Sequence, residues 1–213
     1  MIYPLYIVAI HRINQKQLPV LFFGAGLPQV AALSGNAKSY AERLFSYPHV
    51  DALSEDDAKD AICAPLEREN VQIEKEALNE IIRSTHGYPY FLQEWGSHTW
   101  GIAENNLITL RDVKQATQAA IRSLDNGFFK VRFDRLTPKE REYLQAMSCL
   151  GKGPYRSSDI AHFLKKDAKS LGPCRWQIIS KGMIYSPSHG DIDFTVPLFD
   201  EYLRRNFPFN DLP

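Results

Sequence analysis

The stretch Thr85–Trp95 constrains the fold of this chain most strongly, because one helix end and one helix start fall within a few residues of each other. Gly87 can take the left-handed backbone conformation that closes a helix. Pro89 has the fixed φ and the missing N–H that suit the first turn of the next helix. Aromatic side chains flank the proline, so the corner is apolar and stiff. It can pack against its own core or against a flat ring such as adenine, and the residues alone leave both interpretations open.

Length and composition indicate an ordinary globular protein. A chain of 213 residues can form one large or two small domains, and its 44% hydrophobic and 23% charged residues are typical of such proteins. No apolar run is long enough to cross a bilayer, and the N-terminus lacks the features of a signal peptide. The widely spaced Cys63, Cys149 and Cys174 argue against a disulfide framework or a zinc site. We therefore expect a cytoplasmic protein without a metal site.

The net charge of zero hides an uneven distribution of charge along the chain. Residues 50–125 carry 7 basic against 14 acidic side chains, and residues 126–181 carry 12 against 5. This asymmetry indicates either units with different partners or two solvated faces that attract each other across a domain boundary.

Four helices are predicted between residues 54 and 125. Ser54 is a capping residue followed by three acids, and Thr109 has Asp112 in the reciprocal capping position. Two further helices are predicted near residues 74–84 and 88–103, with their Phe and Trp side chains in the core. Four helices with short connections predict a small bundle.

The last part of the chain has the predicted element order of a winged helix-turn-helix. The pair Asn126-Gly127 is typical of a boundary, and Thr137-Pro138-Lys139-Glu140 combines a capping threonine, a first-turn proline and a reciprocal glutamate. The remaining predicted elements are helices over residues 157–164 and 170–181, strands over 183–187 and 192–196, and a closing helix over 197–205.

The first part of the chain reads as a helix over residues 2–14 and a short buried strand at Leu18–Phe23, closed by Gly24-Ala25-Gly26. In open α/β sheets, ligands bind at the carboxyl ends of such strands. One helix and one strand cannot form a stable parallel sheet, so we interpret this segment as the last portion of a nucleotide-binding domain.

The motifs that bind nucleotide phosphates are not found in the sequence. A Walker A loop, Gly-x-x-x-x-Gly-Lys-Ser/Thr, cradles the phosphates with backbone N–H groups and a lysine. The only Gly-Lys pair, Gly151-Lys152, has Ala146 in place of the first glycine and Gly153 in place of the hydroxyl residue. The predicted strand ends in glycine rather than in the acid that a Walker B strand uses to hold Mg²⁺. We expect no ATP hydrolysis by this chain alone.

The motif Gly87-Tyr88-Pro89, with a strand and loop before it and a winged helix after it, resembles the lid-domain motif of the STAND branch of AAA+ P-loop ATPases. The resemblance covers most of the chain and extends to archaeal or bacterial ATPases that resemble origin-recognition ATPases. It implies a mostly α fold with a small β component. The parts would be the tail of a P-loop α/β domain over residues 1–52, a four-helix lid over 53–125 and a C-terminal winged helix-turn-helix over 126–213.

The resemblance also implies roles for single residues. In that family the proline of the motif lies against the nucleotide base, which assigns nucleotide binding to Gly87, Tyr88 and Pro89. Arg43 stands where AAA+ proteins carry an arginine that points at a neighbour's phosphate, although a surface arginine at a helix end is the alternative. The place of the sensor-1 residue holds Gly24-Ala25-Gly26-Leu27-Pro28-Gln29, which lacks the usual polar Asn, Ser or Thr.

The second helix of a winged pair can enter the major groove of DNA. Six residues would supply phosphate and base contacts: Lys165, Lys166, Lys169, Arg175, Gln177 and Lys181. Clustered cations favour DNA, whereas Asp191 and Asp193 at the wing would repel phosphates. Winged helices of STAND proteins are also structural or protein-binding, so DNA and protein partners both stay open.

These observations predict the C-terminal part of an ATPase that acts as a nucleotide-controlled switch. ATP and Mg²⁺ would bind only together with an upstream P-loop, and the winged helix would engage DNA or a protein. The alternative is a non-enzymatic regulator or adaptor, in which the lid and the winged helix act by binding alone.

Overall fold

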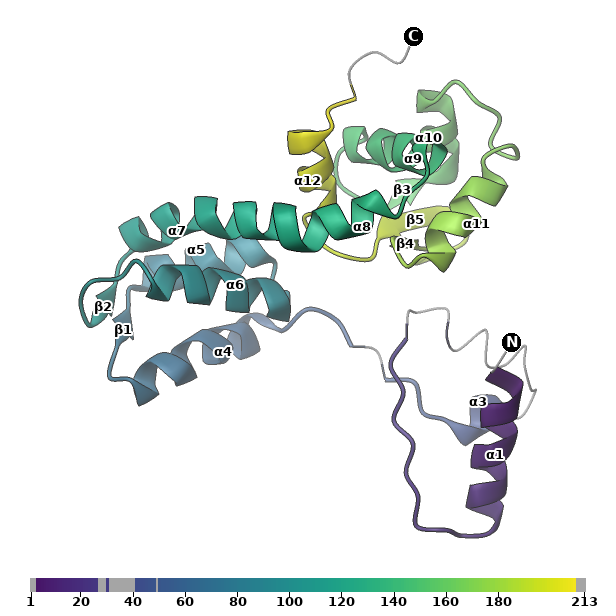
Figure 1. The fold of residues 1–213 in the computed structure, drawn as a ribbon, viewed down its shortest axis with the longest axis horizontal. Helices are drawn as coiled ribbons and strands as arrows, with labels where there is room; N and C mark the ends of the chain where they lie inside the picture. The colour runs from purple at the N-terminus through teal and green to yellow at the C-terminus, as the bar shows by residue number, and fades with distance from the viewer. Residues whose placement is uncertain (1–2, 27–29, 31–40, 49, 210–213) are drawn as a thin grey trace. The chain divides into compact units, whose positions relative to one another are not determined.

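The computed structural model describes residues 3–26, 30, 41–48 and 50–209 (Figure 1). Its contacts divide the chain into two compact units, residues 1–50 and 51–213. The described residues are mainly helical, with small sheets, as the sequence predicts.

The first unit contains α1 (Tyr3–Gln15) and α3 (Ala41–Leu44), and the predicted N-terminal helix is confirmed. The prediction of a buried strand at Leu18–Phe23 is wrong, because this segment has no regular structure, and Leu21 and Phe23 are 84% and 89% exposed. A buried parallel strand needs neighbours for its backbone groups and for both of its faces, and no described residue supplies a paired strand here. Residues 27–29 of the sensor-1 segment lie outside the described residues.

The second unit begins with a bundle of the four predicted helices. They are α4 (Glu55–Arg68), α5 (Lys75–Thr85), α6 (Pro89–Trp100) and α7 (Leu110–Ser123). The predicted caps are present: the Ser54 hydroxyl accepts the N–H of Asp57 at 3.2 Å, and Thr109 and Asp112 form a capping box. A short parallel pair that the sequence does not predict, β1 (Gln72–Ile73) with β2 (Leu107–Ile108), closes one end of this helical bundle.

A continuous helical path connects the helical bundle to the last part of the chain. Helix α7 runs through a π-helical turn, η1 (Leu124–Phe129), into α8 (Lys130–Asp134), so the boundary predicted at Asn126-Gly127 is not a break in the helix (Figure 1). Glycine costs about 1 kcal/mol in a helix interior. Burial of Leu124 and Phe129, each 1% exposed, outweighs that cost.

The last part of the unit has the element order of a winged helix. Its helices are α9 (Pro138–Cys149), α10 (Ser157–Phe163), α11 (Gly172–Ser180) and α12 (Phe199–Asn206). Its strands are β3 (Tyr155–Arg156), β4 (Ile184–Tyr185) and β5 (Asp191–Phe194). They form an antiparallel sheet in the order β3-β5-β4, in which Ile184 pairs with Phe194. The sequence predicts all of these elements except the two-residue strand β3.

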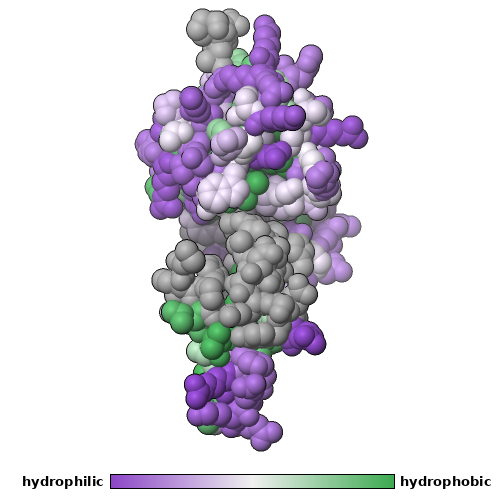
Figure 2. Space-filling model, turned by 90° about the vertical axis from the view of Figure 1, so that its right-hand side faces the viewer, coloured by the Kyte–Doolittle hydropathy of each residue, from purple (hydrophilic) through white to green (hydrophobic). Residues whose placement is uncertain are grey.

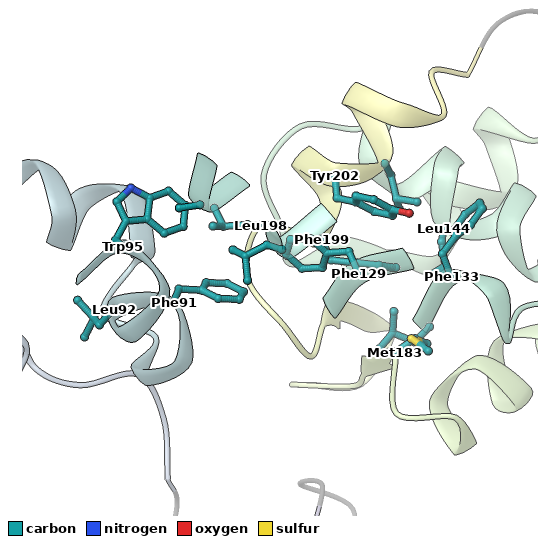
Figure 3. Close-up of a cluster of buried hydrophobic side chains, with 14 of the residues drawn as sticks. Phe91, Leu92, Trp95, Phe129, Phe133, Leu144, Met183, Leu198, Phe199 and Tyr202 are labelled. Atoms are coloured by element: carbon teal, nitrogen blue, oxygen red, sulfur yellow. The ribbon is translucent and has the colours of Figure 1, made fainter. Parts of the chain in front are cut away.

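One cluster of buried side chains extends from the helical bundle into the winged helix. Figure 3 shows Phe91 and Trp95 of α6 at one side of the cluster, and Phe129 of η1 beside Phe199 and Tyr202 of α12 toward the winged helix. The two parts therefore share a hydrophobic core.

No helix in the described residues is long and apolar enough to cross a membrane. Among the same residues, no group of three or more His, Cys, Asp and Glu side chains is placed to hold a metal ion.

Candidate functional site

The corner between α5 and α6 depends on a glycine. His86 and Gly87 both have left-handed backbone conformations, with φ of 53° and 68°. The N–H of Leu53 donates to the Gly87 carbonyl at 3.0 Å, and a Cβ on Gly87 would lie 2.8 Å from the Leu53 carbonyl oxygen. Gly87 therefore allows the segment before α4 to lie directly against the corner.

The residues of the corner motif have different environments. The ring of Tyr88 is partly buried, with its centroid 4.7 Å from that of Phe91. Pro89 is exposed and is the first residue of α6. It lines a cavity of about 360 Å³ between α4 and α6. We call this cavity the α4–α6 groove; its other lining residues include Ala61, Pro65, Gly96, Ser97 and Trp100.

The groove can accept a flat apolar ring. Its walls are mostly aliphatic and aromatic side chains, and Pro89 presents a rigid ring at one end of α6. Within the motif, Gly87 sets the backbone, Tyr88 packs in the core, and Pro89 is the residue that is free to contact a ligand.

Arg43 lies in α3 of the first unit, and its side chain is exposed. Its role at a neighbour's phosphate stays a prediction.

The structure divides the six residues predicted to bind DNA into two groups. Three of them, Lys166, Arg175 and Lys181, make contacts within the protein. The ammonium of Lys166 lies 2.6 Å from a carboxylate oxygen of Glu142, and Arg175 donates to the hydroxyl of Ser157 at 2.9 Å.

Lys181 has a structural role. Its ammonium donates to Glu140 Oε2 at 2.6 Å and to the Arg135 carbonyl at 3.0 Å. Glu140 is buried, and it also accepts the N–H of Thr137 as part of the α9 capping box. Burial alone would raise the pKa of Glu140, but the bonds from Lys181 and Thr137 lower it below its usual range. Lys181 thus fixes the end of α11 to the start of α9.

The second group is Lys165, Lys169 and Gln177. All three are exposed, and their side chains make no hydrogen bond or ion pair with any other residue that the structure describes. Lys165 and Lys169 lie in the connection between α10 and α11, and Gln177 lies on α11. These side chains are available to a partner.

Sequence reasoning missed the main feature of α11. The exposed residues of this helix are Pro173, Trp176, Gln177 and Ser180, so its solvent face is uncharged. Trp176 is 68% exposed. The sequence shows that these four positions are spaced as on one face of a helix, but the prediction was based mainly on the nearby lysine and arginine residues. Figure 2 faces the side of α10 and α11, where hydrophilic and intermediate residues make up most of the visible winged-helix surface.

The wing does not add positive charge. The tip between β4 and β5 contains His189, and Asp191 accepts a hydrogen bond from the Ser188 hydroxyl at 2.6 Å. Burial raises the pKa of Asp193 in β5. Between Ser186 and Phe194 there is no lysine or arginine that could contact a phosphate.

Aromatic rings connect the corner to the winged helix. The ring of Tyr90 stacks on Phe128 of η1 at 4.9 Å, and the guanidinium of Arg132 lies 3.6 Å from the Phe128 centroid. Phe129, the next residue, stacks on Tyr202 of α12 at 5.2 Å (Figure 3). These ring contacts therefore form a continuous packed connection from the start of α6 to α12.

Comparison with known proteins gives distant similarities. The sequence profile of a domain of unknown function (DUF8462) matches residues 126–203. No curated protein matches the chain. Among solved structures, a variant of Thermotoga maritima RuvB has 16% identity and a TM-score of 0.39 over 80% of this chain and 56% of that one. Another structure of the T. maritima protein, described as a Holliday junction branch migration motor, has 15% identity and a TM-score of 0.35 over 77% and 51%. The chain thus spans just over half of these structures, and the likeness is too distant to assign a function.

Proposed function

We propose that this chain is the lid and winged helix of a STAND- or AAA+-type ATPase, and that it acts as a nucleotide-controlled switch. The observation that carries the proposal is the corner at Gly87, which leaves Pro89 exposed at the end of an apolar groove. In this proposal the base of ATP packs on Pro89, and its phosphates and Mg²⁺ are held by a P-loop that is not in this sequence.

In this proposal the position of the winged helix changes with the conformation of the corner. Helix α7, η1 and α8 form one helical path between the two parts, and the stacked rings of Tyr90 and Phe128 lie beside it. Binding of a nucleotide shifts a switch only if it favours one of two arrangements. Contact between the base and Pro89 would favour one of two positions of the corner, and the winged helix would change position with it.

The variant Pro89→Ala tests this proposal. It should weaken ATP binding roughly fivefold, because it removes about 1 kcal/mol of apolar contact with the base. The protein is purified as its source cells make it, its mass is compared with the 24.3 kDa of this chain, and ATP affinity is measured by calorimetry. Pro138→Ala is the matched control, because Pro138 holds the same first-turn position in α9.

Unchanged affinity in Pro89→Ala, in a protein that carries a P-loop and binds ATP, would overturn the proposed role of the corner. A natural product of 24.3 kDa without ATP binding would favour the second candidate, a non-enzymatic winged-helix regulator or adaptor.

The partner of the winged helix is DNA or a protein, and salt dependence separates the two. Binding to a random DNA duplex through Lys165 and Lys169 would weaken steeply with salt. The slope of log affinity against log salt concentration would fall by about one for each lysine removed. A flat salt dependence would exclude binding through phosphates.

A further inference from the structure

The junction between the helical bundle and the winged helix contains a cavity of about 420 Å³. Residues of α5, α6 and α7 line it from the bundle, and residues of α12 and of the connection between α9 and β3 line it from the winged helix. We call it the junction cavity. Its volume lies within the roughly 300–1,000 Å³ of sites that bind small molecules. It shares no lining residue with the α4–α6 groove, so the two are separate sites.

The charged groups on the wall of the junction cavity are mainly cations. Arg83 of α5 lines it from the bundle, and Lys152 and Arg205 line it from the winged helix. Glu201 of α12 is the one carboxylate that lines it among the described residues. His86, at the end of α5, adds an imidazole. The wall therefore presents three cations and a single carboxylate to a ligand.

The two arginines of the wall are partly paired. Arg83 donates through Nε and Nη2 to Glu80 at 2.6–3.2 Å, and its Nη1 makes no hydrogen bond with the described residues. Arg205 donates through Nε and Nη2 to Asp125, and its Nη1 lies 3.6 Å from Glu201 Oε2. Glu80 and Asp125 balance the arginine charges without lining the cavity. Each guanidinium has N–H groups left for a ligand, because it carries five.

Lys152 and His86 have hydrogen-bond donors without partners. Both residues are exposed, and neither side chain makes a hydrogen bond or an ion pair in the part of the chain that the structure describes. An ammonium has three donors and no acceptor. Together with Nη1 of Arg83, these groups place donors on both sides of the cavity. A ligand that supplies acceptor oxygens would satisfy them, and the charge of Lys152 favours an anion.

The rest of the wall is largely apolar. It includes Ile121 of α7, together with Trp95, Leu198 and Phe129, which are labelled in Figure 3. The indole Nε1 of Trp95 donates to the hydroxyl of Thr117 at 3.0 Å, so this polar group is already satisfied. A cavity of about 420 Å³ is larger than a phosphate ion needs. We therefore expect a ligand with an organic part that packs against the apolar side chains.

We propose that the junction cavity binds a small phosphate monoester. Its phosphate accepts hydrogen bonds from Lys152, His86 and Arg83, and its organic part fills the apolar remainder. A phosphate group suits donors from several elements because it presents three acceptor oxygens. His86 directly precedes Gly87, so a ligand that contacts both His86 and Lys152 would join the corner to the winged helix. This inference goes beyond the proposed nucleotide switch and concerns a different cavity.

Calorimetric titration of the intact chain without nucleotide tests the proposal, with phenyl phosphate as the probe. We expect saturable binding that is at least about fivefold tighter than that of inorganic phosphate, which lacks the apolar ring. Phenol, which lacks the anion, should also bind more weakly. Equal binding of inorganic phosphate would indicate an adventitious ion only and would overturn the proposal.

Two variants change the charge of the wall in opposite directions. Lys152→Ala should weaken binding of phenyl phosphate roughly three- to fivefold, the effect of one charged contact at a solvated rim. Lys169→Ala is the control, because Lys169 is an exposed lysine outside the cavity. Glu201→Gln should tighten binding by a similar factor, since it removes the carboxylate from the wall and releases Nη1 of Arg205. A gain in affinity cannot result from misfolding.

Tryptophan fluorescence locates the binding site. Trp100 and Trp176, the other two tryptophans of the sequence, are 48% and 68% exposed. Replacing both by phenylalanine should therefore retain the fold and leave Trp95 as the single tryptophan. Phenyl phosphate should change the fluorescence of Trp95 with the same affinity that calorimetry gives, because Trp95 lines the cavity.

Absence of saturable phenyl phosphate binding overturns the proposal. So does equal binding by Lys152→Ala and Lys169→Ala, or binding that leaves the fluorescence of Trp95 unchanged. Pro89→Ala should bind phenyl phosphate with unchanged affinity, because Pro89 does not line the junction cavity. Failure of this proposal is thus distinguishable from failure of the proposed ATP site.

Discussion

At the scale of single residues, Gly87 and Gly127 show how one residue type can be required at one position and replaceable at another. Gly87 has a φ of 68°, and a Cβ there would lie 2.8 Å from a backbone oxygen. Gly127 lies in η1 with nothing within 4 Å of its Cβ position. We expect Gly87→Ala to lower the free energy of unfolding by about 2 kcal/mol or more, from backbone strain and the clash. Gly127→Ala should raise it by about 0.5–1 kcal/mol, from the helix propensity of alanine.

Urea denaturation of the two glycine variants against the unchanged chain measures both effects. A stable Gly87→Ala protein would contradict the close approach of Leu53 to the corner.

The Lys181–Glu140 pair makes a second prediction at this scale. Removing Lys181 leaves the Glu140 side chain, which is 1% exposed, without its cation, although the Lys181 side chain itself is 34% exposed. Lys181→Ala should therefore cost about 1–3 kcal/mol in the free energy of unfolding at neutral pH. Lys165→Ala is the control and should change stability by less than about 0.5 kcal/mol.

The pH dependence of stability follows from the same pair. The pKa of Glu140 is lower in the folded than in the unfolded chain, so the unfolded chain binds more protons in acid. The stabilisation is present above about pH 4.3 and is lost as the pH falls through the folded-state pKa. In Lys181→Ala this loss should be smaller. If the free energy of unfolding of Lys181→Ala, measured by urea denaturation, falls with acid as steeply as that of the unchanged chain, the pairing of Glu140 with Lys181 is contradicted.

At the scale of elements, local signals predicted most helices. The capping residues Ser54, Thr109 and Thr137 mark helix starts that the structure confirms. Such caps act within a few residues, so one sequence is enough to find them. The hairpin of β4 and β5 was predicted for the same reason, from alternation around a turn.

The elements that sequence missed depend on distant contacts. The pair Asn126-Gly127 is a turn signal by itself, but Leu124 and Phe129 on either side of it are buried in the shared core and keep the chain helical. The strand predicted at Leu18–Phe23 failed because an apolar run specifies burial without specifying a partner strand.

The candidate site was predicted unevenly. The glycine corner was found because a positive φ and a first-turn proline leave a signature in the sequence. The basic positions were found as a group, but ion pairs such as Lys181 with Glu140 join residues far apart in the chain. Sequence alone therefore could not tell the available cations, Lys165 and Lys169, from the structural ones.

At the scale of the whole second unit, the shared core predicts common unfolding of the helical bundle and the winged helix. Phe129 contacts Phe91 at 5.8 Å between centroids on one side and Tyr202 at 5.2 Å on the other. We expect a single transition in urea by tryptophan fluorescence and by circular dichroism. Phe129→Ala should lower stability by about 3–5 kcal/mol. Two separate transitions in the unchanged chain would contradict a shared core.

The π-helical turn η1 also determines the direction in which the winged helix points. An α-helix turns by about 100° for each residue, so the number of residues between α7 and α8 sets the rotation of everything that follows. One residue fewer in this turn would rotate α9 to α12 by roughly that angle about the helix axis and would disrupt the hydrophobic core that they share with the helical bundle. The number of residues at this turn therefore fixes the orientation of α11, and an insertion or deletion here would lower stability as well as change that orientation.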